Sequence, residues 1–152
     1  MTLQEERNEQ GHKASLLLID KYGEFYNFHE WEHKHKGYDV EEIDWSVYIE
    51  TKYRGPKSPI DITKSQAEMS HVISVFDEFW DDYHCLTSEY LKYADTTSYY
   101  LKHQEGKYKR VSWSKFIKIG TTDLKEILDP LIEQSEPATS LSRFFNNQSE
   151  TI

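Results

Sequence analysis

Residues 69–93 of the chain, MSHVISVFDEFWDDYHCLTSEYLKY, carry the strongest periodic pattern in the sequence. Large apolar side chains recur there at alternating intervals of three and four residues, at Met69, Val72, Phe76, Phe79, Tyr83, Leu86, Tyr90 and Tyr93. Such intervals place side chains along one face of an α-helix. The pattern therefore predicts one long helix that packs on a core, and Thr63 or Ser65 is suited to cap its start.

The residues before this stretch favour β-strands. Gly23 would cost about 1 kcal/mol inside a helix, and a β-favouring aromatic segment follows it closely. We therefore expect strands over residues 15–20 and 24–33, with a helix as the alternative. Residues 1–13 are polar and charged, which predicts a loose leader or a short helix, and residues 37–42 read as a connector.

Three further elements follow from the pattern of apolar residues. Residues 43–54 alternate between apolar and polar side chains, which predicts a strand whose polar face carries Glu50. Residues 97–104 and 108–119 are rich in β-favouring residues and flank a glycine, so they predict a hairpin. Residues 121–134 carry leucine and isoleucine at helical spacing, which predicts a short helix.

These elements together predict an α+β fold, in which an antiparallel sheet of about five strands is packed by one long and one short helix. A chain of 152 residues fits a single domain. We assign that domain to residues 14–135. The polar leader over 1–13 precedes it, and a flexible tail over 136–152 follows it, because the tail is polar and has no sustained period.

Composition indicates a non-secreted protein. The one cysteine, Cys85, has no partner for an internal disulfide, which favours a reducing compartment. The longest apolar run, residues 16–19, is far shorter than the roughly 18 residues that a membrane span needs, and no signal peptide is visible. We therefore expect a cytoplasmic protein with no membrane association. Its net charge of −9 favours a basic partner over nonspecific binding to nucleic acid.

Residues 29–33 read His-Glu-Trp-Glu-His and match the H-E-x-x-H pattern of zinc proteases. In that pattern His29 and His33 bind one metal from a helix, while Glu30 activates the bound water. Our strand prediction for residues 24–33 argues against such a helix. On a strand, His29, His33 and His35 would share one face and form a weaker zinc site, with a solvated histidine cluster as the alternative.

The predicted hairpin is basic although the whole chain is acidic. Residues 98–119 contain six lysines and arginines and one acidic residue, with aromatic side chains between the charges. Basic residues with interleaved aromatics suit contact with a nucleic-acid backbone and its bases. The candidate nucleic-acid contacts are Lys102, Tyr108, Lys109, Arg110 and Lys118. The alternative is that the hairpin neutralises an acidic neighbour within the fold.

The tail contains three large apolar side chains, Leu141, Phe144 and Phe145, in a segment that has no core of its own. Such anchors on a flexible tail indicate docking onto a partner or onto the domain itself. Their spacing resembles the PIP box, the clamp-binding motif Q-x-x-Leu-x-x-Phe-Phe of replication and repair proteins. Ala138 stands at the position of the glutamine. The resemblance covers eight residues and implies that these three side chains fill a hydrophobic pocket on a partner.

The sequence favours a non-enzymatic protein-binding or regulatory module over an enzyme, because no nucleophile constellation or phosphate-binding loop stands out. One form of this module is a clamp-docking accessory protein of DNA replication or repair. The other is an acidic inhibitor of a basic toxin or nuclease, of the immunity-protein kind. The alternatives are a zinc-dependent hydrolase that uses His29, Glu30 and His33, and a protein that binds nucleic acid through residues 98–119. We expect no cofactor unless the zinc reading holds.

Overall fold

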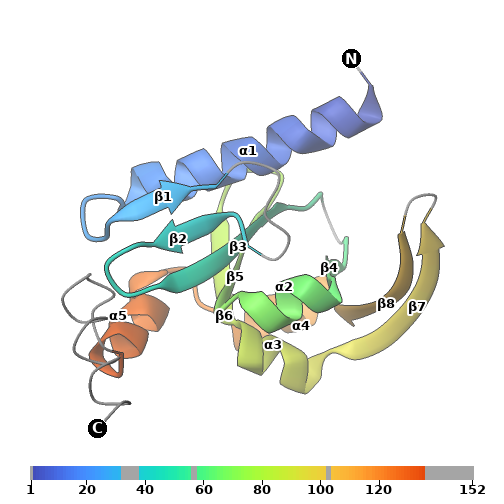
Figure 1. The fold of residues 1–152 in the computed structure, drawn as a ribbon. Coiled ribbons are helices and arrows are strands. Elements are labelled where there is room, and N and C mark those ends of the chain that lie inside the picture. Colours follow the sequence, from blue (N-terminus) through green and yellow to red (C-terminus); the bar gives the residue numbers. More distant parts are fainter. Residues whose placement is uncertain (1, 32–37, 56–57, 102–103, 136–152) are drawn as a thin grey trace, which may run out of the picture.

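The computed structural model describes residues 2–31, 38–55, 58–101 and 104–135, and Figure 1 shows its ribbon. The predicted tail, with Leu141, Phe144 and Phe145, lies outside the described residues. Five helices and eight strands make up the described part. In chain order they are α1 (Leu3–Tyr22), β1 (Phe28–Glu30), β2 (Val40–Glu42), β3 (Val47–Tyr53), β4 (Ile60–Ile62), α2 (Lys64–Met69), β5 (Val72–Phe76), β6 (Asp82–Leu86), α3 (Thr87–Tyr93), β7 (Asp95–Leu101), β8 (Gln104–Val111), α4 (Trp113–Ile119) and α5 (Lys125–Glu133).

The α+β class is confirmed, and the larger sheet has five strands in the order β1-β2-β3-β5-β6. The sheet is mixed, so the prediction of a purely antiparallel sheet is wrong. β3 and β5 are parallel, whereas the other three neighbouring pairs are antiparallel. A parallel pair needs a crossover connection, and here β4 and α2 lie within it. A second, three-stranded sheet has the order β4-β8-β7.

The larger sheet separates two cores. On one face, α1 and α5 pack against β3 and β5 through a buried cluster that includes Leu18, Ile49 and Leu128. On the other face, the small sheet, α3 and α4 pack through a cluster that includes Ile73 and Phe116. Figure 1 shows α1 along one side of the molecule and the long β7–β8 hairpin extending away from the sheet.

Residues 69–93 do not form the predicted helix. They form β5, a turn, β6 and the seven-residue α3. All five residues of β5 are buried, because this interior strand, between β3 and β6, is covered on both faces. A strand that is buried on both faces has a continuous run of apolar residues instead of an alternating pattern. The spacing of apolar residues therefore does not distinguish such a strand from a buried helix. Thr63 does cap a helix, but that helix is the six-residue α2.

Residues 3–22 form one continuous helix, so the predicted strand over residues 15–20 is wrong. Ala14, Leu18 and Tyr22 are buried at intervals of four residues, which is the helical repeat. Gly23, which argued against a helix, comes immediately after its end as the C-cap. The predicted arrangement of one long and one short helix is also wrong in detail. The described residues form five helices, and the long one is α1, near the N-terminus.

The remaining strand predictions hold in part. The strand over 43–54 is confirmed as β3, whereas the strand over 24–33 is limited to β1, and β2 occupies part of the predicted connector. The hairpin is confirmed as β7 and β8, but residues 113–119 form α4 and not strand. Within the described ranges, no helix is long and apolar enough to cross a bilayer. A cytoplasmic location stays a prediction.

Candidate functional site

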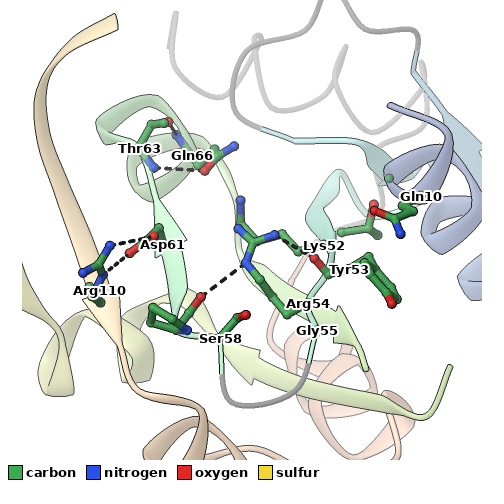
Figure 2. A pocket seen from close by; sticks show the side chains of 13 residues that line it. Gln10, Lys52, Tyr53, Arg54, Gly55, Ser58, Asp61, Thr63, Gln66 and Arg110 are labelled. Atoms are coloured by element: carbon green, nitrogen blue, oxygen red, sulfur yellow. Dashed lines mark hydrogen bonds and ion pairs between the residues drawn. The ribbon is translucent and has the colours of Figure 1, made fainter. Parts of the chain in front are cut away.

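A cavity of about 730 Å³ opens at the carboxyl end of β3, between the two sheets and α1. Gln10 of α1 lies at one side of it, and Asp61 of β4 and Arg110 of β8 lie at the opposite side (Figure 2). Gly11 of α1 also lines the cavity. The residues of β3 that reach it are consecutive, from Thr51 to Tyr53, and Arg54 and Gly55 follow. The cavity therefore joins parts of the chain that are up to 100 residues apart.

The lining of the cavity is basic, in a protein of net charge −9. Its charged residues are Lys52, Arg54, Asp61 and Arg110, three basic and one acidic. Arg110 and Asp61 form a two-point ion pair, with Nε–Oδ1 at 2.6 Å and Nη2–Oδ2 at 3.1 Å. Arg54 donates from Nη1 to the carbonyl oxygen of Tyr53 at 2.7 Å, which fixes its guanidinium beside the cavity. A concave surface of this charge attracts anions.

Two carboxyl groups lie behind this lining, one of Glu50 on β3 and one of Asp39, the residue immediately before β2. Because the β2–β3 pairing aligns Val40 with Ile49, Asp39 lies opposite Glu50. The Glu50 side chain is 7% exposed, and its Oε1 accepts a hydrogen bond from Nε2 of Gln66 at 2.9 Å. Gln66 is itself one of the residues that line the cavity.

Lys52 lies on the same face of β3 as Glu50, since side chains two residues apart on a strand point the same way. Its Nζ is 3.7 Å from Oε1 of Glu50, and its side chain is 9% exposed. Burial raises the pKa of Glu50, and the neighbouring Asp39 carboxyl raises it further, whereas Lys52 acts in the opposite direction. Burial likewise lowers the pKa of Lys52.

The Asp39 carboxylate is held by Thr51. Its Oδ2 accepts from the main-chain N of Thr51 at 3.0 Å and from Oγ1 of Thr51 at 3.2 Å. Thr51 Oγ1 lies 2.6 Å from Oγ of Ser15, so these contacts tie the carboxylate to α1. The orientation of Asp39 is thereby fixed in the folded protein.

The pair of carboxyl groups fits a hard divalent cation. The described residues contain no group of three or more histidine, cysteine, aspartate or glutamate side chains placed to hold a metal. A metal ion at Asp39 and Glu50 therefore needs further oxygen ligands from the main chain, water or a bound substrate. Mg²⁺ is usually held in this way, by one or two carboxylates, several waters and the phosphates of the substrate.

The predicted zinc residues are not brought together in the described part of the chain. His29 lies in β1, where its ring contacts Trp31, and Glu30 pairs with His12 of α1 at 2.6 Å. Residues 28–30 are strand, so the helix that the H-E-x-x-H pattern requires is not formed there. His33 and His35 lie outside the described residues, and the weaker zinc reading stays a prediction.

The predicted nucleic-acid residues fall on two elements. Lys109 and Arg110 are on β8, whereas Lys118 is on α4. Arg110 is the one among them that the structure places in the lining of the cavity. Lys102 lies outside the described residues, and the side chain of Tyr108 is likewise not described.

A second polar cluster is buried beneath α1. Ser74 Oγ lies 2.7 Å from Nδ1 of His84, whose Nε2 lies 2.6 Å from Oδ2 of Asp82. Asp82 also pairs with Lys21 at 2.5 Å and accepts from the hydroxyl of Tyr22. Ser74 and His84 are fully buried and Asp82 is 5% exposed, so this chain of groups fastens α1 to β6 and is closed to a substrate.

Asp39, Glu50 and Lys52 were missed from the sequence. A signal was present, because Glu50 and Lys52 alternate around Thr51 on a strand that was predicted correctly, which places a carboxylate and an ammonium on one face. Asp39 gave no such signal, since its segment was interpreted as a connector. No protein-family model matches the chain, and a search of curated proteins finds no match.

Proposed function

We propose that the protein is a Mg²⁺-dependent phosphodiesterase that cleaves nucleic acid, with Asp39, Glu50 and Lys52 in its active centre. One observation carries the proposal: the buried carboxyl of Glu50, the half-buried carboxyl of Asp39 and the Lys52 side chain, which is 9% exposed, lie together beside a basic cavity. Buried groups with shifted pKa values in a concave site are typical of functional sites.

Asp39 and Glu50 are the metal ligands in this proposal. Burial raises the pKa of Glu50, and the neighbouring carboxyl of Asp39, which is half-buried, raises it further because two ionised carboxylates repel each other. A divalent cation removes the repulsion and holds both groups ionised. When bound, Mg²⁺ polarises a phosphoryl oxygen and lowers the pKa of a coordinated water.

Lys52 is the cationic group next to the scissile phosphate. Its ammonium is within 3.7 Å of a proposed ligand oxygen, so a phosphate that shares the metal would also lie near Lys52. Lysine binds phosphate as a point charge. In the reaction, water attacks the phosphorus and the bond to the leaving oxygen breaks. The water proton goes to that oxygen, which gives a phosphomonoester and a hydroxyl.

Nucleic acid is the substrate class that the charge of the cavity favours. Phosphodiester backbones bind to clustered lysine and arginine side chains. Arg110 of the cavity belongs to the β7–β8 hairpin, which is the segment that the sequence singled out for nucleic-acid contact. The hairpin and the carboxyl pair therefore support one function together, since one binds the backbone and the other holds the metal.

Cleavage of labelled oligonucleotides tests the proposal. Wild-type protein should cleave DNA or RNA with Mg²⁺ and not with EDTA. Asp39→Asn, Glu50→Gln and Lys52→Met should each lower the rate by about 100-fold or more. Glu42→Gln is the matched control, because Glu42 is a buried carboxyl of β2 that accepts hydrogen bonds from two main-chain N–H groups. It should leave the cleavage rate unchanged.

Two results would contradict the proposal. If Mg²⁺ produces no cleavage of any oligonucleotide, the carboxyl pair and Lys52 form only a structural ion pair. If cleavage persists in Glu50→Gln and Lys52→Met at the wild-type rate, the activity comes from another site or another protein. Titration with Mn²⁺, followed by electron paramagnetic resonance, checks metal binding separately and should fail in Glu50→Gln.

The protein-binding module expected from the sequence stays a separate proposal. Its residues, Leu141, Phe144 and Phe145, lie outside the described part, so no geometry favours it. Deletion of residues 136–152 tests it, because loss of a partner in affinity capture would support docking through the tail. The acidic-inhibitor form predicts instead that the shortened chain keeps the partner.

A further inference from the structure

Tyr53 gives the cavity an aromatic side. It is the last residue of β3, lines the cavity and is half-buried. Its ring lies 4.8 Å from that of Trp80, with 33° between the two planes. Figure 2 shows Tyr53 and Gln10 at one side of the cavity, with Arg54 between them and the Asp61–Arg110 pair.

Trp80 is fixed behind Tyr53 by several contacts. Its ring lies 6.4 Å from Phe76, and Nζ of Lys13 lies 4.2 Å from its centroid. Its backbone has φ of 64°, which is uncommon for a bulky residue. Asp77 holds this turn, since its Oδ1 accepts from the main-chain N of Phe79 and of Asp81. The aromatic pair is therefore in place before any ligand arrives.

The size of the cavity suits one or two nucleotides. At about 730 Å³ it falls within the range of roughly 300–1,000 Å³ typical of small-molecule sites. Protein closes the cavity on two sides. A B-form duplex is a broad body, wider than its own major groove of about 12 Å, so we do not expect a duplex to enter the cavity. On the α1 side, a Cβ atom at Gly11 would meet nothing within 4 Å, so space remains there.

Cations and an aromatic ring are thus combined in one confined site. Lys52, Arg54 and Arg110 supply positive charge, and Tyr53 supplies a flat apolar surface. Proteins that bind single strands use this combination: the cations follow the backbone and the bases stack on aromatic side chains. In a duplex, the bases already stack on one another and their faces are covered.

We infer that the cavity takes an unpaired nucleotide, whose base stacks on Tyr53 while its phosphate lies at Lys52 and Arg54. The substrate class is single-stranded nucleic acid or a frayed end. The inference names the substrate of the proposed phosphodiesterase. It rests on that function only for the cleavage of the strand after the strand has bound. Trp80 and Lys13 are positioning residues for Tyr53.

Binding without turnover tests the inference. Fluorescence anisotropy in EDTA compares a labelled single strand with the duplex of the same sequence, and the single strand should bind at least about tenfold more tightly. Tyr53→Leu should weaken single-strand binding by about tenfold, and Tyr53→Phe should retain it. The control is Tyr83→Leu, a half-buried tyrosine of β6 whose ring contacts Trp113, and it should bind as the wild type does.

A second measurement uses the wild-type protein and so does not depend on variants that fold. Abasic residues are placed one at a time along the single strand. At one position, loss of the base should weaken binding by about fivefold or more, because that base stacks on Tyr53. Inorganic polyphosphate, which has no bases, should compete poorly.

The inference is overturned if the duplex binds as tightly as the single strand, if no abasic position matters, or if polyphosphate competes as well as the single strand. These outcomes are distinct from failure of the proposed function. Mg²⁺-dependent cleavage of duplex and single strand at equal rates would retain the phosphodiesterase and remove the stacking site. Tyr53-dependent binding of single strands without cleavage would retain the stacking site and remove the phosphodiesterase.

Discussion

Glu50 should make the ligand-free protein less stable as the pH rises, and Glu50→Gln should remove this dependence. The carboxyl of Glu50 is 7% exposed and lies against the Asp39 carboxyl, so its pKa is raised above the 4.5 of an exposed glutamate. An acid with a raised pKa in the folded state binds more protons folded than unfolded, at every pH between the two pKa values. Stability therefore falls as the pH rises through that interval.

The size of the effect follows from the linkage slope. One proton per molecule corresponds to about 1.4 kcal/mol per pH unit. Between about pH 5 and about pH 7, the wild type should thus lose up to about 3 kcal/mol of unfolding free energy through Glu50. Glutamine has nearly the same shape and does not titrate, so the stability of Glu50→Gln relative to wild type should rise by this amount over the same range.

Urea denaturation at a series of pH values measures the difference. Gln66→Leu is the control, because it removes the hydrogen-bond donor to Glu50 but keeps the carboxyl, and it should retain the wild-type slope at a lower stability. Saturating Mg²⁺ should flatten the slope of the wild type and leave Glu50→Gln unchanged. A difference between Glu50→Gln and wild type that stays constant from pH 5 to pH 7 would refute the reasoning, since Glu50 would then be ionised throughout.

Four other substitutions test the site and the packing of the fold. Thr51→Val removes the hydroxyl that holds Asp39 and should weaken Mg²⁺ binding by about tenfold, with recovery in Thr51→Ser, as measured by Mg²⁺-dependent thermal shift. Gly11→Ala should raise the unfolding free energy by about 0.5–1 kcal/mol, because the new Cβ is unobstructed; Gly120→Ala should lower it, because the Cβ would lie 2.7 Å from a carbonyl oxygen of β6. Tyr90→Phe should cost about 1–3 kcal/mol in urea denaturation, since its buried hydroxyl lies 2.6 Å from carbonyl oxygens of both β4 and β8.

The sequence by itself determined the elements whose local pattern agrees with their surroundings. β3 is half polar and half apolar along its length, and its alternation identified it correctly. The β7–β8 hairpin and the helix near residues 125–133 were also found, although their bounds shifted. In β3 the apolar side chains alternate with polar ones, and in α5 they recur at helical spacing, so the local period of each element identifies it.

Only the tertiary structure decided residues 69–93. The spacing of their apolar residues fits a helix, but β5 is an interior strand that is covered on both faces, so all five of its residues are buried. Its parallel pairing with β3 is a long-range contact that leaves no mark on the local sequence. Tertiary contacts also decided residues 15–20. Their packing against the sheet favours a helix, although Gly23 lies nearby in the sequence.

The candidate site also has one part that the sequence predicts and another that only the tertiary structure brings together. Glu50 and Lys52 share a face of β3 because of the two-residue period of a strand, and this much is written in the sequence. Asp39 and Arg110 meet them only through the pairing of β2 with β3 and the packing of β8 beside β4. Tyr53 follows Lys52 directly on β3, and only the tertiary structure places Trp80 against its ring. Strand pairing brings distant residues together through main-chain hydrogen bonds, which any side chain permits, so the sequence does not encode which strands become neighbours in any local pattern.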